Sequence, residues 1–528
     1  MTSCKTKFRY WWSRGIVAAA LTVALSFGPA PAIAQEDTVV IGLVAEPVTF
    51  DPTQIGDLNT SRVVRRIYEG LTGFVYGTYD IEPRLAESWE ISEDGLQYTF
   101  KLRDGVVFHD GTPFNAEAVK YSYERQTDPA HQARGSLTYR YASNYLGNVE
   151  SIDVIDDLTV RFTLKQPQAP FLQYLTNLTL SIVSPTALAK YVDEIAQNPS
   201  GTGPYKLVEW EPGVKAVLAA NDKYYRGTPE IETLIYVPVI EAQARLSAIS
   251  TGEIDLTYDV PVDSLESLRE NPDVVVKTGL SAHVWYVVLN TQLSDPPFDN
   301  KLVRQAMNYA IDKGAIVKNI LMGTGEVSSS PLSPIYGGYY NPDVKKYPYN
   351  PEKARELLTE AGYPDGFKCE FLVPESGSGM QSPVEMGTFI QANLKEVGID
   401  CSIKTMEWGA YLAEYRNSPQ MAEMSWNATM GDPDYVMHLL FHSSANPPGW
   451  NAGWYANAQV DALLSEARVV SDGDRRRKLY LEAQAIVAED APWLFVNHGQ
   501  QIVVHTARLK GFELSPNFDF QLEKATLE

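Results

Sequence analysis

The residue pattern most suggestive of chemistry lies late in the chain, where His438 and His442 stand four residues apart. In a helix this spacing puts both imidazoles on one face, close after Asp432 and Asp434, and resembles the spacing of metal ligands. Leu439 takes the position at which a zinc protease carries Glu, so the segment lacks that catalytic motif. Histidines at helical spacing more often pack or cap, and we therefore expect no metal site here.

Other catalytic constellations are absent from the sequence. It has no G-x-S-x-G elbow and no H-E-x-x-H motif. Two of its three cysteines, Cys369 and Cys401, lie within strand-like segments rather than in a reactive setting. Its 66 acidic residues include no pair in a recognisable catalytic context. Among enzymes, a hydrolase is the main alternative function that we weigh. The sequence nevertheless predicts no enzyme and no cofactor.

The first 34 residues have the order of a Sec-type signal peptide: a basic region, a short apolar run at 16–27 and a small-residue site at 32–34. No later segment offers the roughly 20 apolar residues that a membrane-spanning helix needs. Cys4 precedes the apolar run, whereas a lipoprotein cysteine would follow it. We therefore expect a free periplasmic protein that begins near Gln35 and is not a lipoprotein.

Charge and size narrow the class further. The chain has 44 basic and 66 acidic residues; removing 1–34 takes away four basic residues and leaves a net charge of about −26. Phosphate backbones should repel so acidic a protein, and we expect no nucleic-acid partner. The nearly 500 remaining residues should form two or three domains.

Cys369 and Cys401 each take the third position of a short apolar segment, FKCEFLV (367–373) and IDCSIKT (399–405). An exported compartment permits them to pair, and neighbouring strands would bring the two sulfurs close. Two small buried thiols are the equally weighted alternative, because connectivity cannot be read from sequence.

Two kinds of local pattern indicate two kinds of domain. Apolar and polar residues alternate over 96–102 and again over 158–164, between Asp-Gly or Asp-Asp turns, which predicts a β-meander with one buried face. Asn115 should cap a helix that follows the first of these hairpins. The later half instead reads as strand 367–373, a helix with capping-box spacing at Ser382 and Glu385, and strand 399–405, which predicts a parallel α/β unit.

Six separated segments carry a family resemblance: 85–125, GTGPYKLVEWEPG (201–213), VRQAMNYAIDKGAIV (303–317), YNPEKARELLTEAGYPDGF (349–367), GDPD (431–434) and YLEAQAIVAEDAPWLFV (480–496). In this order they resemble the family 5 extracellular solute-binding proteins, the dipeptide, oligopeptide and nickel binders of ABC importers. The resemblance covers essentially the whole chain after residue 34.

This resemblance implies an α/β fold with two lobes around a cleft, a type II periplasmic binding protein of the cluster C kind, with a small α+β domain inserted in the first lobe. It places the discontinuous domain of lobe 1 at 35–80, 201–284 and 498–528, the insertion at 81–200 and lobe 2 at 285–497. Strands near 285–290 would form part of a hinge. It also implies a small-molecule ligand, ABC permease subunits as partners and a monomer; a chemoreceptor role stays open.

Ligand anchors of the peptide binders are missing at the matching positions. Thr429 stands where an aspartate, three residues after Trp426, would pair with the α-amine of a peptide. A hydroxyl cannot neutralise an ammonium. The basic residues that meet a dipeptide's carboxylate fall near Val384 and Glu385. We therefore expect a sugar-like or opine-type ligand first, a modified or longer peptide second and a metal chelate third.

Further candidate ligand contacts follow from the same resemblance. Trp408 and Trp426 match tryptophans that line side-chain pockets, although core packing is the commoner fate of tryptophan. Arg140 would meet a carboxylate or phosphate if it faces the cleft, and Asp432 belongs to a motif that more often fixes loop geometry. The remaining candidates match cleft-facing stretches of relatives and are Tyr139, Tyr141, Asp57, Asn59, His283 and Trp285.

Overall fold

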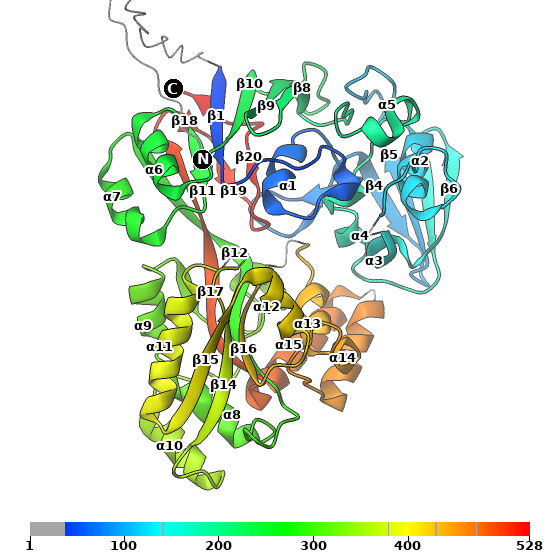
Figure 1. Cartoon of the computed structure of the whole chain (residues 1–528). Helices are drawn as coiled ribbons and strands as arrows, with labels where there is room; N and C mark the ends of the chain where they lie inside the picture. The colour runs from blue at the N-terminus through cyan, green and yellow to red at the C-terminus, as the bar shows by residue number, and fades with distance from the viewer. Residues whose placement is uncertain (1–36, 140–141, 378–379, 428–429, 471) are drawn as a thin grey trace, which may run out of the picture. The chain divides into compact units, whose positions relative to one another are not determined.

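The computed structural model describes residues 37–139, 142–377, 380–427, 430–470 and 472–528 (Figure 1). The predicted leader, 1–34, lies outside these residues. Within them, eleven strands form one mixed sheet, with β13 (Gly325–Val327) beside β17. The other ten run in the order β15 (Ile399–Met406), β14 (Phe367–Pro374), β16 (Met421–Asn427), β12 (Val274–Leu289), β17 (Trp493–Thr506), β11 (Leu256–Tyr258), β1 (Thr38–Leu43), β10 (Thr233–Pro238), β9 (Lys215–Ala220) and β8 (Tyr205–Glu211).

Two long antiparallel strands, β12 and β17, connect the two lobes (Figure 1). Their paired stretch near Val274 continues into β11 and β1, which belong to what we call the first lobe. Their other paired stretch, from His283 onward, continues into β16, β14 and β15 of the second lobe. The pairing register shifts between Leu280 and His283, so an irregularity lies where the strands pass from one lobe to the other.

Helices cover both faces of the sheet in the second lobe, which explains why the part of β12 that lies there, 284–289, is a continuous apolar run. Trp285, Val287 and Leu289 point into one core and Tyr286 and Val288 into the other. The helices of the second lobe are α8 (Lys301–Ala310), α9 (Lys313–Ala315), α10 (Pro351–Glu360), α11 (Pro383–Glu396), α12 (Trp408–Tyr415), α13 (Asp434–Phe441), α14 (Ala458–Val469) and α15 (Gly473–Asp490).

The predicted meander is present as a separate four-stranded antiparallel sheet of β4 (Ala86–Ile91), β5 (Gln97–Leu102), β7 (Thr159–Leu164) and β6 (Val149–Asp156). Tyr98 and Phe100 are buried as the alternation requires, and Asn115 accepts a hydrogen bond from the Ala118 amide at 3.0 Å, capping α2 (Ala116–Thr127). The other helices of the first lobe are α1 (Leu58–Val64), α3 (Ala142–Leu146), α4 (Phe171–Tyr174), α5 (Pro185–Tyr191), α6 (Ala242–Thr251) and α7 (Leu265–Glu270).

Strand β14, helix α11 and strand β15 form the predicted parallel unit. Cys369 lies directly opposite Cys401 in the register, and a disulfide joins them, which decides between the two alternatives that the sequence left open. The capping box is a wrong prediction: Ser382 takes a left-handed φ of 58°, and its side chain makes no capping hydrogen bond. Pro383 still begins the helix where expected, because its fixed φ suits the first turn.

Short strand pairs complete the fold: β2 (Thr72–Phe74) with β3 (Ile81–Pro83), β18 (Leu509–Lys510) with β21 (Thr526–Leu527), and β19 (Glu513–Leu514) with β20 (Phe520–Gln521). Among the helices of the described ranges, none has both the length and the apolar character needed to cross a membrane.

Candidate ligand-binding site

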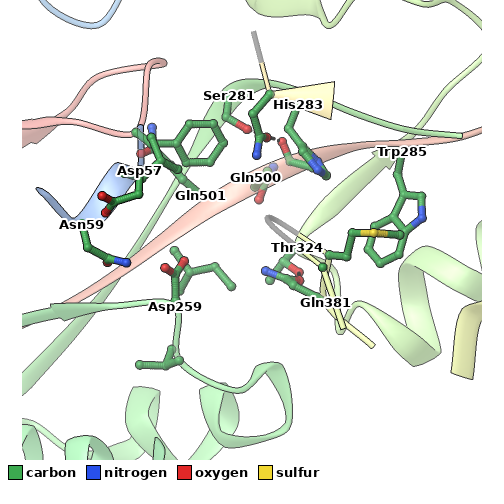
Figure 2. Close-up of a pocket in the computed structure, with 18 of the residues that line it drawn as sticks. Asp57, Asn59, Asp259, Ser281, His283, Trp285, Thr324, Gln381, Gln500 and Gln501 are labelled. Atoms are coloured by element: carbon green, nitrogen blue, oxygen red, sulfur yellow. Dashed lines mark hydrogen bonds between the residues drawn. The ribbon is translucent and has the colours of Figure 1, made fainter. Parts of the chain in front are cut away.

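A cavity of about 980 Å³ opens where the strands pass between the lobes. The first lobe contributes α1 and the segment after β11, the strands β12 and β17 contribute the floor, and the second lobe contributes 319–324 and the residues around the start of α11. A volume of this size suits a small-molecule ligand of drug-like dimensions. Polar side chains from both lobes surround the cavity (Figure 2).

The floor of the cavity follows from the register of the two long strands. His283 lies opposite Gly499 and Trp285 lies opposite Asn497, and all four residues line the cavity. Glycine is required at 499, because a Cβ there would lie 2.2 Å from Nδ1 of His283. Burial lowers the pKa of His283 to about 4, so its imidazole is neutral near pH 7. Its Nε2 is buried and has no hydrogen-bond partner among the described residues.

Trp285 is held by a residue that the sequence analysis missed. Its indole Nε1 donates a 2.8 Å hydrogen bond to Oε1 of Glu423, which is fully buried on β16. Burial raises the pKa of Glu423 well above its usual range, more than the hydrogen bond from Trp285 lowers it, which favours the neutral acid. The signal was present in MAEMSW (421–426), where one carboxyl interrupts an otherwise apolar strand.

The predicted residues Asp57 and Asn59 line the first-lobe side of the cavity (Figure 2). Asp57 caps α1, with Oδ1 accepting from the Thr60 amide at 2.9 Å. Asn59 accepts a 2.9 Å hydrogen bond from the Tyr258 hydroxyl through Oδ1. Each side chain therefore keeps some hydrogen-bonding capacity for a ligand while being oriented by the protein.

Charged residues that the sequence analysis did not single out also line this wall: Arg62 and Arg65 of the α1 region, and Asp259 just after β11. Arg62 is buried, and its Nη1 lies 3.6 Å from Oδ2 of Asp259. The spacing of the two arginines, one helical turn apart on a short segment, was visible in the sequence, but nothing there showed which face of α1 the cavity adjoins.

Four other predicted residues are described but do not line this cavity. Trp426 packs against Trp450, with ring centroids 5.2 Å apart, and Trp408 stacks on a neighbouring tyrosine. The Tyr139 hydroxyl donates to a backbone carbonyl at 2.8 Å. Asp432 is buried in a bidentate pair with Arg476, with oxygen–nitrogen distances of 2.7 and 2.8 Å, as suits a residue that fixes a loop.

Three predicted residues, Thr429, Arg140 and Tyr141, lie outside the described residues. His438 and His442 stack, with ring centroids 4.4 Å apart, and burial lowers the pKa of His438 to about 3. Within the ranges that the structure describes, no cluster of three or more His, Cys, Asp or Glu side chains is placed to hold a metal ion.

A mixed α/β fold with two lobes joined by crossing strands, and a polar cavity lined by both, defines a solute-binding protein of the periplasmic binding type. Residues 80–448 match the model of the bacterial extracellular solute-binding proteins, family 5. The chain belongs to this family and is the solute-binding component of an ABC importer.

Relatives with different ligands match nearly the whole chain. A glutathione-binding protein, GsiB, of Shigella flexneri is 34% identical over 96% of this chain and 98% of its own. Heme-binding protein A of Haemophilus influenzae is 35% identical over 91% of this chain and 90% of its own. The solved structure of AgaA from A. tumefaciens R10, in complex with agropinic acid, superposes with a TM-score of 0.71 at 26% identity and covers 93% of this chain and 99% of AgaA.

Proposed function

We propose that this protein captures a small polar conjugate of an amino acid, of the modified-peptide or opine type, and delivers it to the permease of an ABC importer. The observation that carries the proposal is the composition of the cavity wall. Two arginines and an aspartate form a charged patch on the first lobe. Amides such as Gln381 and Gln500 supply donors and acceptors elsewhere (Figure 2). A neutral sugar has no charged group that could pair with the charged patch.

The ligand-binding step follows from the position of the cavity. A ligand that contacts both lobes gains more interactions when they are closed around it, so binding shifts the population toward the closed state. The strands β12 and β17 run through both lobes, and we expect them to form the hinge. The chain binds its ligand without transforming it, acts as a monomer, and reaches the periplasm through its Sec-type leader without lipid attachment.

Two relatives support an amino-acid conjugate as the ligand. One is named as a glutathione-binding protein, and the other was solved in complex with agropinic acid. A thermal-shift panel on the mature protein tests the proposal, because a ligand that binds only the folded state raises the melting temperature. The panel holds glutathione, agropinic acid, hemin, ordinary dipeptides and neutral oligosaccharides. We expect stabilisation by a conjugate. Stabilisation by unmodified dipeptides or neutral sugars alone would refute the proposed ligand class.

Localisation has its own test. Cell fractionation should place the mature protein in the soluble periplasmic fraction, and a variant lacking residues 1–34 should stay in the cytoplasm. Retention of the full chain in the membrane fraction would contradict export as a free protein.

A further inference from the structure

A guanidinium and a carboxylate stand side by side in the wall of the cavity. Nη1 of Arg62 lies 3.6 Å from Oδ2 of Asp259, which is close enough for an ion pair but too long for a hydrogen bond. The same Nη1 has no hydrogen-bond partner among the described residues. The pair therefore presents one positive and one negative group to the cavity without satisfying either fully.

The Arg62 guanidinium is held rigidly. It lies 3.5 Å from the centre of the Tyr258 ring, and its Nε donates to the Phe518 carbonyl at 3.1 Å. The side chain is only 6% exposed, so few alternative conformations are open to it. Such a guanidinium binds an anion with little further loss of conformational freedom.

Arg65 adds a second positive charge one helical turn away in the same wall. Its Nε donates a 3.3 Å hydrogen bond to Ser61, and none of the carboxylates in the described ranges lies within 4.0 Å of it. Burial lowers the pKa of Arg65, because the attraction of Asp519 does not offset the loss of hydration. An anionic ligand group would supply the missing countercharge.

Asp259 carries the negative charge on an exposed side chain, 62% accessible, that faces the cavity (Figure 2). Its backbone has a φ of 52°, a left-handed conformation that aspartate tolerates better than most residues. Arg245 fixes this conformation by donating to the Asp259 carbonyl at 3.2 Å. The backbone of Asp259 is therefore fixed, and its carboxylate lies beside Arg62.

We propose that this patch, Arg62, Arg65 and Asp259, binds the α-amino-acid head group of the ligand. The head-group carboxylate pairs with the two guanidinium groups, and the ammonium on the same carbon pairs with Asp259. A linear peptide carries its free ammonium and carboxylate on different residues and satisfies only one side of the patch. The site thus selects compounds conjugated through an amino-acid side chain, such as γ-glutamyl peptides, and this inference rests on the proposed function.

Calorimetric titration of the mature protein tests the site with glutathione and Nε-acetyl-lysine, two conjugates that share only an intact head group. Each is compared with derivatives that are N-acetylated on the α-amine or amidated on the α-carboxylate. We expect the derivatives to bind about ten- to a hundredfold more weakly than the parent compounds. The α-linked tripeptide Glu-Cys-Gly should also bind more weakly than glutathione.

Two variants locate the effect. Arg65→Gln should weaken binding of the parent compounds and reduce their advantage over the amides, because only Arg62 then remains to pair with the carboxylate. Asp259→Asn should remove their advantage over the N-acetyl forms. Arg269→Gln, at an exposed arginine of α7 away from the cavity, is the matched control and should change nothing. Unchanged thermal unfolding of each variant shows that it is folded.

The outcomes separate the two proposals. Equal binding of parents and derivatives, or no binding of the conjugates and of free amino acids alike, overturns the head-group site. If agropinic acid then still binds, the proposed function stands without the site. If free amino acids bind through Arg65 and Asp259 but no conjugate binds, the site stands and the proposed ligand class fails.

Discussion

Replacing Glu423 by glutamine should make the protein more stable at neutral pH. Glu423 is fully buried on β16, its Oε1 accepts from the Trp285 indole at 2.8 Å, and its Oε2 has no partner among the described residues. In the unfolded chain an ordinary glutamate ionises above a pKa of about 4.3. Burial raises the pKa in the folded protein well above that, so folding near neutral pH requires proton uptake at this carboxyl.

The sign and size of the effect follow from this linkage. A carboxyl with a raised folded-state pKa gives its full contribution to stability below the unfolded-state pKa and loses it as pH rises toward the folded-state pKa. The loss is about 1.4 kcal/mol for each pH unit in that window. A glutamine does not titrate, and its Oε1 still accepts from Trp285. The variant should therefore match the wild type near pH 4 and gain stability steadily above it.

Urea unfolding followed by tryptophan fluorescence, at intervals from pH 4 to pH 8, measures the difference. Because two lobes can unfold separately, the transition that includes the second lobe is compared. Glu370→Gln, at an exposed carboxyl on the neighbouring strand β14, should show no such slope. A flat difference for Glu423→Gln across this range, or a loss of stability at pH 7, would refute the reasoning.

Three further changes test how the fold is stabilised. Gly499→Ala should lower the free energy of unfolding by about 1–3 kcal/mol, because the new Cβ would lie 2.2 Å from the His283 ring. Gly473→Ala, which has open space around it, should leave stability unchanged, and thermal unfolding compares the two variants. Arg476→Met should cost about 3–5 kcal/mol in urea unfolding, since it leaves the Asp432 carboxylate buried and unpaired, and a smaller loss would mean that water reaches that carboxylate. Replacing both disulfide cysteines by alanine should lower the free energy of unfolding by about 2–4 kcal/mol, because the bond joins residues 32 positions apart and restricts the unfolded chain. An unchanged unfolding midpoint would contradict this.

Sequence patterns predicted the elements well where one physical rule dominates. Alternation over 96–102 and 158–164 gave strands with the buried faces as expected, and Asn115 caps its helix as predicted. The capping box at Ser382 failed because spacing alone does not determine the backbone conformation of the capping residue, which here is left-handed. Local sequence signals thus predict where a helix or strand begins more reliably than which hydrogen bonds cap its end.

The cavity was harder to predict, because its wall draws on segments from α1 to β17 that are far apart in the chain. Asp57 and His283 were placed there through resemblance, whereas Arg62, Asp259 and Glu423 lie at positions to which no resemblance gave a role. The charges to which we attribute ligand selection are therefore ones that family likeness did not point to. The predicted lack of peptide anchors on the second lobe, together with the guanidinium–carboxylate pair on the first, agrees with our proposal that the first lobe would hold the charged part of the ligand. The substitutions Arg65→Gln and Asp259→Asn address this proposal more directly than any substitution at the family's peptide anchors.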